Sequence, residues 1–168
     1  MRFGEKATRC AAALVMALGS AACDSPAPLS PSHAVVIETI DGDTLRAEIA
    51  GTRETIRLIG VDTPETKHPT KPVQCYGPEA AQFLATLLPP GTRVRIERDI
   101  EARDPYGRLL LYLFVTNDDR ELFVSHAVIA AGMGRPLVIE PNVRHQTELV
   151  AAAFTAQREA RGLWGACR

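Results

Sequence analysis

The chain has 168 residues, a formal net charge of −1 at pH 7 and a hydrophobic content of 46%. This length and composition fit one soluble globular domain with a core of its own. A near-neutral charge gives no reason to expect a protein that holds nucleic acid through general positive charge. Any phosphate chemistry would have to come from a few placed arginines and a cation.

The first 22 residues are typical of a secretory signal. Three basic residues precede the apolar run CAAALVMAL, and the small residues GSAA follow it. An apolar run of about nine residues is too short to cross a bilayer as a helix, so residues 1–22 are predicted to be a signal peptide. Residues 23–33 are rich in proline and serine, which predicts an extended tether before one domain over residues 34–168.

The cysteine count bears on how the exported protein is held. One of the four cysteines lies in the leader, and Cys23, Cys75 and Cys167 remain. An odd number in an exported protein needs an explanation. If Cys23 is the acylated first residue of a lipoprotein, Cys75 and Cys167 are left as a pair, and export favours a disulfide. Because SAA also fits ordinary cleavage, an anchored envelope lipoprotein and a free periplasmic or secreted protein remain alternatives.

The domain begins with three short segments that are rich in β-branched residues, at 34–40, 44–49 and 55–59. The turn sequences DGD and AGTRE separate them, so they predict a three-stranded meander. Residues 76–91 then carry apolar side chains at helical spacing and end in prolines and a glycine. They predict one helix after the three strands.

The second half of the domain predicts two strands and two helices. TRVRIERDI alternates apolar and polar residues, and RLLLYLFV is apolar at nearly every position. Residues 121–132 and 142–164 are amphipathic, the latter with Asn142 as the expected N-cap. The order βββαββαα predicts an α+β, mainly β fold, which is a five-stranded OB-fold barrel with an inserted helix and two C-terminal helices.

The stretch GVDTPETKHP places acidic residues among prolines directly after the third strand. Asp62 and Glu65, three residues apart, could form a helix capping box. Pro69 follows Glu65 so closely that a helix beginning here would barely complete a turn. The pattern therefore favours a functional loop over a capped helix.

A second acidic cluster, DGDT, lies in the turn between the first two strands. Asp41 fits an ordinary hairpin turn, whereas Asp43 opens a strand, where aspartate is disfavoured. The first hairpin and the end of the third strand can approach in an open barrel, so Asp43 and Asp62 are predicted to bind one hard divalent cation. Their oxygens suit Ca²⁺, and the histidines and cysteines lack zinc spacing.

Two arginines complete this set. Arg57 lies within the third strand, and Arg108 stands where the fifth strand begins. A single arginine in a strand is most often solvated or part of a rim ion pair. Two arginines that converge with a carboxylate and a cation can grip a phosphodiester and neutralise developing charge, while the carboxylate activates water.

The strings DGDT, IRLIGVDTPETKHP, YGPEA, DPYGRLLLYLF, EPN with a later histidine, and GLW resemble the thermonuclease or staphylococcal nuclease-like family in order and spacing. The resemblance covers about residues 35–165. It implies a Ca²⁺-dependent, sugar-nonspecific nuclease that cleaves DNA and RNA at the bond to the 5′ oxygen and leaves 3′-phosphate ends. A monomer is expected.

The resemblance also implies roles for single residues. Asp43 and Asp62 match carboxylate ligands of the metal, and Thr63 matches the backbone-carbonyl ligand. Glu65 matches the general base.

Four further positions match residues that contact the substrate. Arg57 matches an arginine that holds the phosphate, and Arg108 matches one that also assists the leaving group. Lys71 and Tyr106 match contacts to the phosphate and sugar of the nucleotide.

Two departures from the family pattern concern nucleotide binding. The family's paired stacking tyrosines precede PN, but GMGRPLVIEPN has no aromatic residue, and Leu137 and Ile139 occupy this segment. Pro105 stands where a lysine is expected. Weak nucleotide binding and little base preference follow.

Two other functions are possible. A catalytically silent OB-fold module could bind nucleic acid or a protein partner, but such a module would be expected to lose Glu65 or an arginine. A scaffold lipoprotein of the envelope would bind Ca²⁺ without turnover. Because the full catalytic set is present, the sequence favours the enzyme.

Overall fold

A computed structural model describes residues 32–66, 72–117 and 120–167. The predicted signal peptide, Cys23 and Lys71 lie outside the described residues. None of the helices in the described part of the chain is long and apolar enough to cross a membrane.

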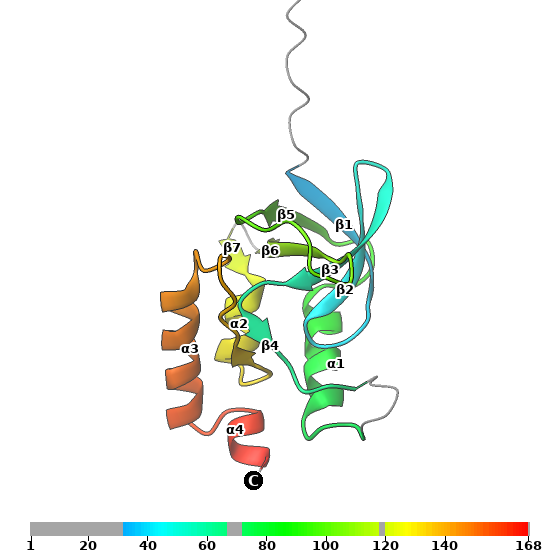
Figure 1. Ribbon diagram of the computed structural model, residues 1–168. Helices are drawn as coiled ribbons and strands as arrows, with labels where there is room; N and C mark the ends of the chain where they lie inside the picture. The colour runs from blue at the N-terminus through cyan, green and yellow to red at the C-terminus, as the bar shows by residue number, and fades with distance from the viewer. Residues whose placement is uncertain (1–31, 67–71, 118–119, 168) are drawn as a thin grey trace, which may run out of the picture.

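The centre of the molecule is a closed barrel of five strands. The six-stranded sheet runs in the order β3-β2-β1-β5-β6-β7, and a further parallel pairing of β3 with β6 closes it. Figure 1 shows the barrel at the top, with the helices below and beside it. The barrel strands are β1 (His33–Thr39), β2 (Thr44–Ile49), β3 (Thr52–Leu58), β5 (Arg93–Glu97) and β6 (Leu109–Asn117).

The alternation of side chains along the strands explains the barrel. In β2, Leu45, Ala47 and Ile49 are buried inside, while Arg46 and Glu48 are exposed. β6 is buried at most positions because the barrel core covers one face, while aromatic and helical elements cover the other. The fold predicted from the sequence, a mainly β OB-type barrel with one inserted helix, is confirmed.

The helices differ in part from the prediction. The inserted helix α1 is present. The C-terminal region has three helices where two were predicted, because a short helix, α4, follows α3. A strand, β7 (Arg120–Phe123), occupies the start of the segment that was predicted as helix 121–132. It pairs antiparallel with β6, and the Phe123 ring stacks on Phe114. The helices are α1 (Gly77–Leu87), α2 (Val124–Ala130), α3 (Gln146–Arg158) and α4 (Leu163–Ala166).

The prediction that Asn142 caps a helix over 142–164 is wrong. The helix begins only at Gln146, and the Asn142 amide instead accepts from the Glu101 N–H and donates to the Glu101 carbonyl. The helix also ends before the predicted limit, at Arg158, because the backbone turns left-handed at Ala160, which has a φ of 50°. Gly162, with a φ of 53°, then precedes α4 as a separate turn.

Two features fix the C-terminal end. The Leu163 N–H donates to the Gly132 carbonyl, which docks α4 on the turn after α2. Cys75 and Cys167 form the predicted disulfide, with an S–S distance of 2.09 Å and a sequence separation of 92. The bond ties α4 to the segment that leads into α1.

Candidate active site

The acidic hairpin and the loop after β3 meet at Asp43. Its Oδ2 accepts hydrogen bonds from the Thr63 N–H at 2.8 Å and the Thr63 hydroxyl at 2.9 Å. Its Oδ1 accepts from the Thr44 hydroxyl at 3.1 Å. The Asp43 carbonyl also accepts from the Leu58 N–H at 2.9 Å, so the hairpin is fixed to the end of β3.

The turn before Asp43 depends on both Asp41 and Gly42. Asp41 Oδ1 accepts from the Asp43 N–H at 3.0 Å, which is the turn role expected for Asp41. A Cβ at Gly42 would lie 2.7 Å from the Thr63 hydroxyl, so only glycine lets the hairpin approach this loop. Burial, and then the Asp43 charge, raises the pKa of Asp41.

Arg57 lies between the two acidic segments. Its Nη1 donates to the carbonyls of Leu58 at 2.9 Å and Val61 at 2.7 Å. Its Nε lies 3.2 Å from Asp43 Oδ1, and its Nη2 lies 3.2 Å from Asp62 Oδ1. The side chain is only 11% exposed, so one largely buried guanidinium joins both predicted metal ligands.

The charges around Asp62 fit a cation. Partial desolvation and the charges of Asp43 and Glu65 raise the pKa of Asp62, against the lowering effect of Arg57 and Arg135. No group of three or more metal-ligating His, Cys, Asp or Glu side chains occurs within the described ranges. A cation here would need the two carboxylates together with backbone oxygen and water. Ca²⁺ accepts such a hard, irregular oxygen set, so the residues present fit it.

Arg57 and Arg108 both line a cavity of about 240 Å³. The parallel pairing of β3 with β6, in which Ile56 lies opposite Leu109, brings Arg57 and Arg108 to the same end of the barrel. The lining also includes Tyr106, Leu137 and Ile139. Arg57 is therefore shared between the acidic cluster and this cavity.

Arg108 is held by a partner that the sequence analysis missed. Its Nε lies 2.6 Å from Asp104 Oδ2, and its backbone N–H donates to Asp104 Oδ1. Burial raises the pKa of Asp104, but the bonds from Arg108 outweigh it and leave that pKa below its ordinary value. The available signal was the spacing of four residues across the DPYGR turn.

Glu65 lies near Asp62 but is not among the described residues that line the arginine cavity. Its Oε1 accepts from the Thr66 N–H at 2.9 Å, and its backbone N–H donates to Gln74 Oε1 at 2.9 Å. The predicted substrate contact Lys71 lies outside the described residues.

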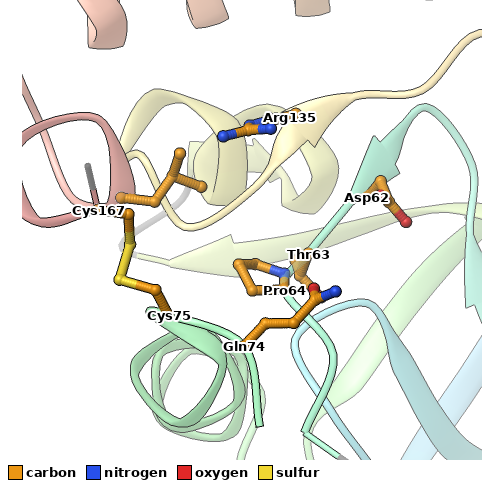
Figure 2. Close-up of a pocket in the computed structure, with 8 residues that line it drawn as sticks. Asp62, Thr63, Pro64, Gln74, Cys75, Arg135 and Cys167 are labelled. Carbon is orange, nitrogen blue, oxygen red and sulfur yellow. A yellow bond between two sulfur atoms is a disulfide. The ribbon is translucent and has the colours of Figure 1, made fainter. Parts of the chain in front are cut away.

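A second cavity, of about 280 Å³, borders the loop that follows β3 (Figure 2). Its lining includes Asp62, Gln74, Arg135 and the disulfide of Cys75 and Cys167. Arg135 belongs to the short strand β8 (Arg135–Pro136), where it pairs with Asp62 of β4 (Val61–Asp62). No local sequence pattern marks Gln74 or Arg135, because both come to this place through tertiary packing.

Comparison with known proteins shows which family the chain belongs to. The family model described as staphylococcal nuclease homologue matches residues 55–166. The thermonuclease of Staphylococcus hyicus is 37% identical over 129 residues, which cover 77% of this chain and 73% of that protein. The thermonuclease of Staphylococcus intermedius is 38% identical over 130 residues, 77% of this chain and 74% of that protein. Endonuclease YncB of Bacillus subtilis is 34% identical over 127 residues, 74% of this chain and 58% of that protein. The chain belongs to the staphylococcal nuclease homologue family.

Proposed function

We propose that this protein is a Ca²⁺-dependent nuclease that hydrolyses DNA and RNA at the bond to the 5′ oxygen and leaves 3′-phosphate ends. The similarity to proteins named thermonuclease and endonuclease supports a nuclease. The observation that carries the proposal is the position of Arg57, which contacts Asp43 and Asp62 and also lines a cavity with Arg108.

The two arginines are suited to hold a phosphodiester. A guanidinium donates in a planar fork that matches phosphate oxygens. Asp104 fixes Arg108, and two backbone carbonyls fix Arg57, so both side chains are oriented before substrate arrives. Donors that are already in place stabilise the charge that develops on the phosphoryl oxygens at little cost in reorganisation. Arg108 would also assist the leaving oxygen.

The acidic residues would serve the cation and the water. Asp43, Asp62 and the Thr63 carbonyl would hold Ca²⁺, and Ca²⁺ bound there would neutralise negative charge at the phosphate. Glu65 would take a proton from the attacking water as general base. The hydrogen bond from the Thr66 N–H orients its carboxylate.

The substrate side of the cavity is apolar and lacks stacking rings before Pro141. Leu137 and Ile139 offer only hydrophobic contact there. We therefore expect weak binding of mononucleotides and little base preference, with Tyr106, Lys71 and the arginines as the other contacts. Cleavage of both DNA and RNA fits such a site.

We further propose that the protein is exported as a monomer and held at the membrane by acylation of Cys23. The predicted leader and the tether of residues 23–33 support this location, and the internal disulfide suits an oxidising compartment. Detection of a diacylglyceryl mass on Cys23 in protein from the cell envelope would test the anchor. An unmodified mature N-terminus would favour free release.

The nuclease is tested by digestion of single-stranded and double-stranded DNA and RNA with Ca²⁺, with Mg²⁺ or with excess chelator. Cleavage with Ca²⁺, little with Mg²⁺ and none with chelator is expected, because Mg²⁺ demands tighter geometry and holds its waters. The product ends should carry 3′-phosphate. Full turnover in chelator would contradict the metal's role. Nucleic-acid binding or Ca²⁺ binding without cleavage would instead favour the silent module or the envelope scaffold.

A further inference from the structure

Gln74 makes two hydrogen bonds to the backbone of Glu65. The Glu65 N–H donates to the Gln74 side-chain oxygen at 2.9 Å, and the Gln74 N–H donates to the Glu65 carbonyl at 2.9 Å. One residue therefore holds the polar groups on both sides of the Glu65 Cα atom. Rotation of the backbone at Glu65, which would redirect its carboxylate, must break at least one of these bonds.

Gln74 is itself fixed by its neighbours. The next residue, Cys75, is bonded to Cys167, and Figure 2 shows Gln74 extending from this disulfide toward Thr63 and Pro64. The Gln74 carbonyl also accepts from the Gly77 N–H at 3.1 Å, at the start of α1.

The other end of the disulfide is anchored to the body of the protein. The Cys167 N–H donates to the Leu163 carbonyl, and the buried Leu163 docks on Gly132 through its own N–H. A Cβ at Gly132 would lie 2.2 Å from the Arg161 carbonyl, so the two backbones are in close contact. Because α4 is docked in this way, the disulfide links Gln74 to a fixed support.

The loop from Asp62 to Glu65 has little room to adjust if this support is lost. A Cβ at Gly77 would lie 3.0 Å from the Pro64 carbonyl, and one at Gly134 would lie 2.8 Å from the Asp62 carbonyl. The loop is thus packed between the start of α1 and the turn before β8. A shift of Gln74 would be transmitted to Glu65 rather than absorbed by slack in the loop.

We propose that Gln74 is a positioning residue for Glu65, and that the disulfide of Cys75 and Cys167 holds Gln74 in place. This inference rests on the proposed nuclease function. Reduction by dithiothreitol would add two electrons and two protons to give two thiols, while the reductant closes to its cyclic disulfide. The reduced protein keeps its barrel but loses the fixed orientation of the general base.

The first test compares variants at position 74. Gln74→Ala removes the acceptor for the Glu65 N–H, and kcat should fall about tenfold or more while KM changes little, because small errors in placement are costly in the transition state. Gln74→Glu keeps an acceptor oxygen and should retain most of kcat. Gln82→Ala, which removes an exposed glutamine from α1, is the matched control and should match the wild type. Equal kcat for Gln74→Ala and the control would overturn the proposal.

A double-mutant cycle shows whether Gln74 acts through Glu65. In a Glu65→Gln background the substitution Gln74→Ala should lower kcat by less than about twofold, because there is no general base left to misplace. If the two losses multiply, then Gln74 acts elsewhere and the proposal is wrong.

Amide hydrogen exchange gives a readout that does not need activity. Exchange of the Glu65 N–H should become faster in Gln74→Ala and in the double variant Cys75→Ser, Cys167→Ser, measured where both are folded by circular dichroism. The cysteine variant should also lose kcat about as Gln74→Ala does. Unchanged Glu65 exchange in the folded variants would overturn the inference. Inactive wild type with faster exchange in the variants would instead reject the proposed function and leave the positioning role standing.

Discussion

At the scale of single residues, Arg57 has a structural task and, in the proposed mechanism, a chemical one. The Arg57 and Asp43 side chains are only 11% and 8% exposed, and Arg57 also binds two backbone carbonyls. The hydrogen bonds and the ion pair that hold the loop are therefore made by the group that faces the cavity. A change at this position should affect both folding and turnover.

We expect Arg57→Lys to lower kcat by about a hundredfold to a thousandfold, because lysine cannot reproduce a bidentate grip on phosphate. It should also lower the free energy of unfolding by up to about 3–5 kcal/mol, since Asp43 keeps a buried charge with a poorer partner. Steady-state kinetics and urea unfolding measure the two effects.

Glu65→Gln is the matched comparison. It should lower kcat by a similar factor but leave the unfolding free energy within about 1 kcal/mol, because the amide oxygen can still accept from the Thr66 N–H. Turnover of Arg57→Lys within about tenfold of the wild type would remove Arg57 from the catalytic set.

The residues that the sequence could identify are those in local motifs. Asp43, Asp62 and Arg57 stand in recognisable strings, and the structure brings them into direct contact. The contacts of Gln74 and Asn142 could not be predicted in this way. Asn142 pairs with a residue 41 positions away, and such a partner is set by the closed barrel and not by spacing.

At the scale of elements, the alternation of apolar and polar residues predicted the strands correctly where one face of the strand is buried, as in β2. It failed at β7 because ELFV reads equally as the first turn of an amphipathic helix, and only pairing with β6 decides for a strand. It failed at the start of α3 because the Asn142 amide is already used by Glu101 and cannot cap.

The Asn142 contact links the segment before α3 to the loop after β5. We expect Asn142→Ala to lower the free energy of unfolding by about 1–3 kcal/mol, since it leaves the N–H and carbonyl of Glu101 without this partner. Urea unfolding with Asn117→Ala, at the exposed end of β6, provides the control. A change no larger than that of the control would mean that water replaces the amide.

Glu97 connects the end of β5 to the start of α3 and should make stability depend on pH. Burial raises its pKa, but hydrogen bonds from His145, Arg144 and Arg95 outweigh it and leave the pKa below the ordinary value of 4.5. Because the folded state favours the ionised form, this contribution is present above the unfolded pKa and is lost as pH falls through the lower folded value.

Urea unfolding measured from about pH 3 to about pH 7 should therefore show a loss of stability on the acid side that is smaller in Glu97→Gln. Glu48→Gln, at an exposed position of β2, should lose as much stability at acid pH as the wild type does. If Glu97→Gln and the wild type lose stability equally as the pH falls, then Glu97 contributes little to the pH dependence of stability.

At the scale of the whole molecule, closure of the barrel creates the site. The parallel pairing of β3 with β6 brings two arginines together in a chain whose net charge is only −1. The disulfide closes a loop of 92 residues and stabilises the fold by about 4.6 kcal/mol in the chain-entropy model. Both effects depend on contacts between distant segments, which explains why composition alone gave no sign of the paired arginines.

The cavity that Arg57 and Arg108 line is also assembled from distant segments, and stacking rings can be introduced there. Leu137 and Ile139 line it together with Arg57 and Arg108, while Val138 is not among its lining residues. An aromatic ring stacked on a base is worth about 1–3 kcal/mol. A stack on a base that does not react stabilises the ground state and the transition state alike.

The double variant Leu137→Tyr, Ile139→Tyr should therefore lower KM for single strands more than it changes kcat, and it should tighten the binding of mononucleotides. Val138→Tyr is the matched control, because it adds a ring to the same segment away from the cavity. Kinetics on single-stranded DNA and calorimetry with a mononucleotide measure the two effects. If the folded double variant binds nucleotide no better than Val138→Tyr does, then the bases do not reach these two side chains, and substrate is held by the other proposed contacts, which are the arginines, Lys71, Tyr106 and the cation.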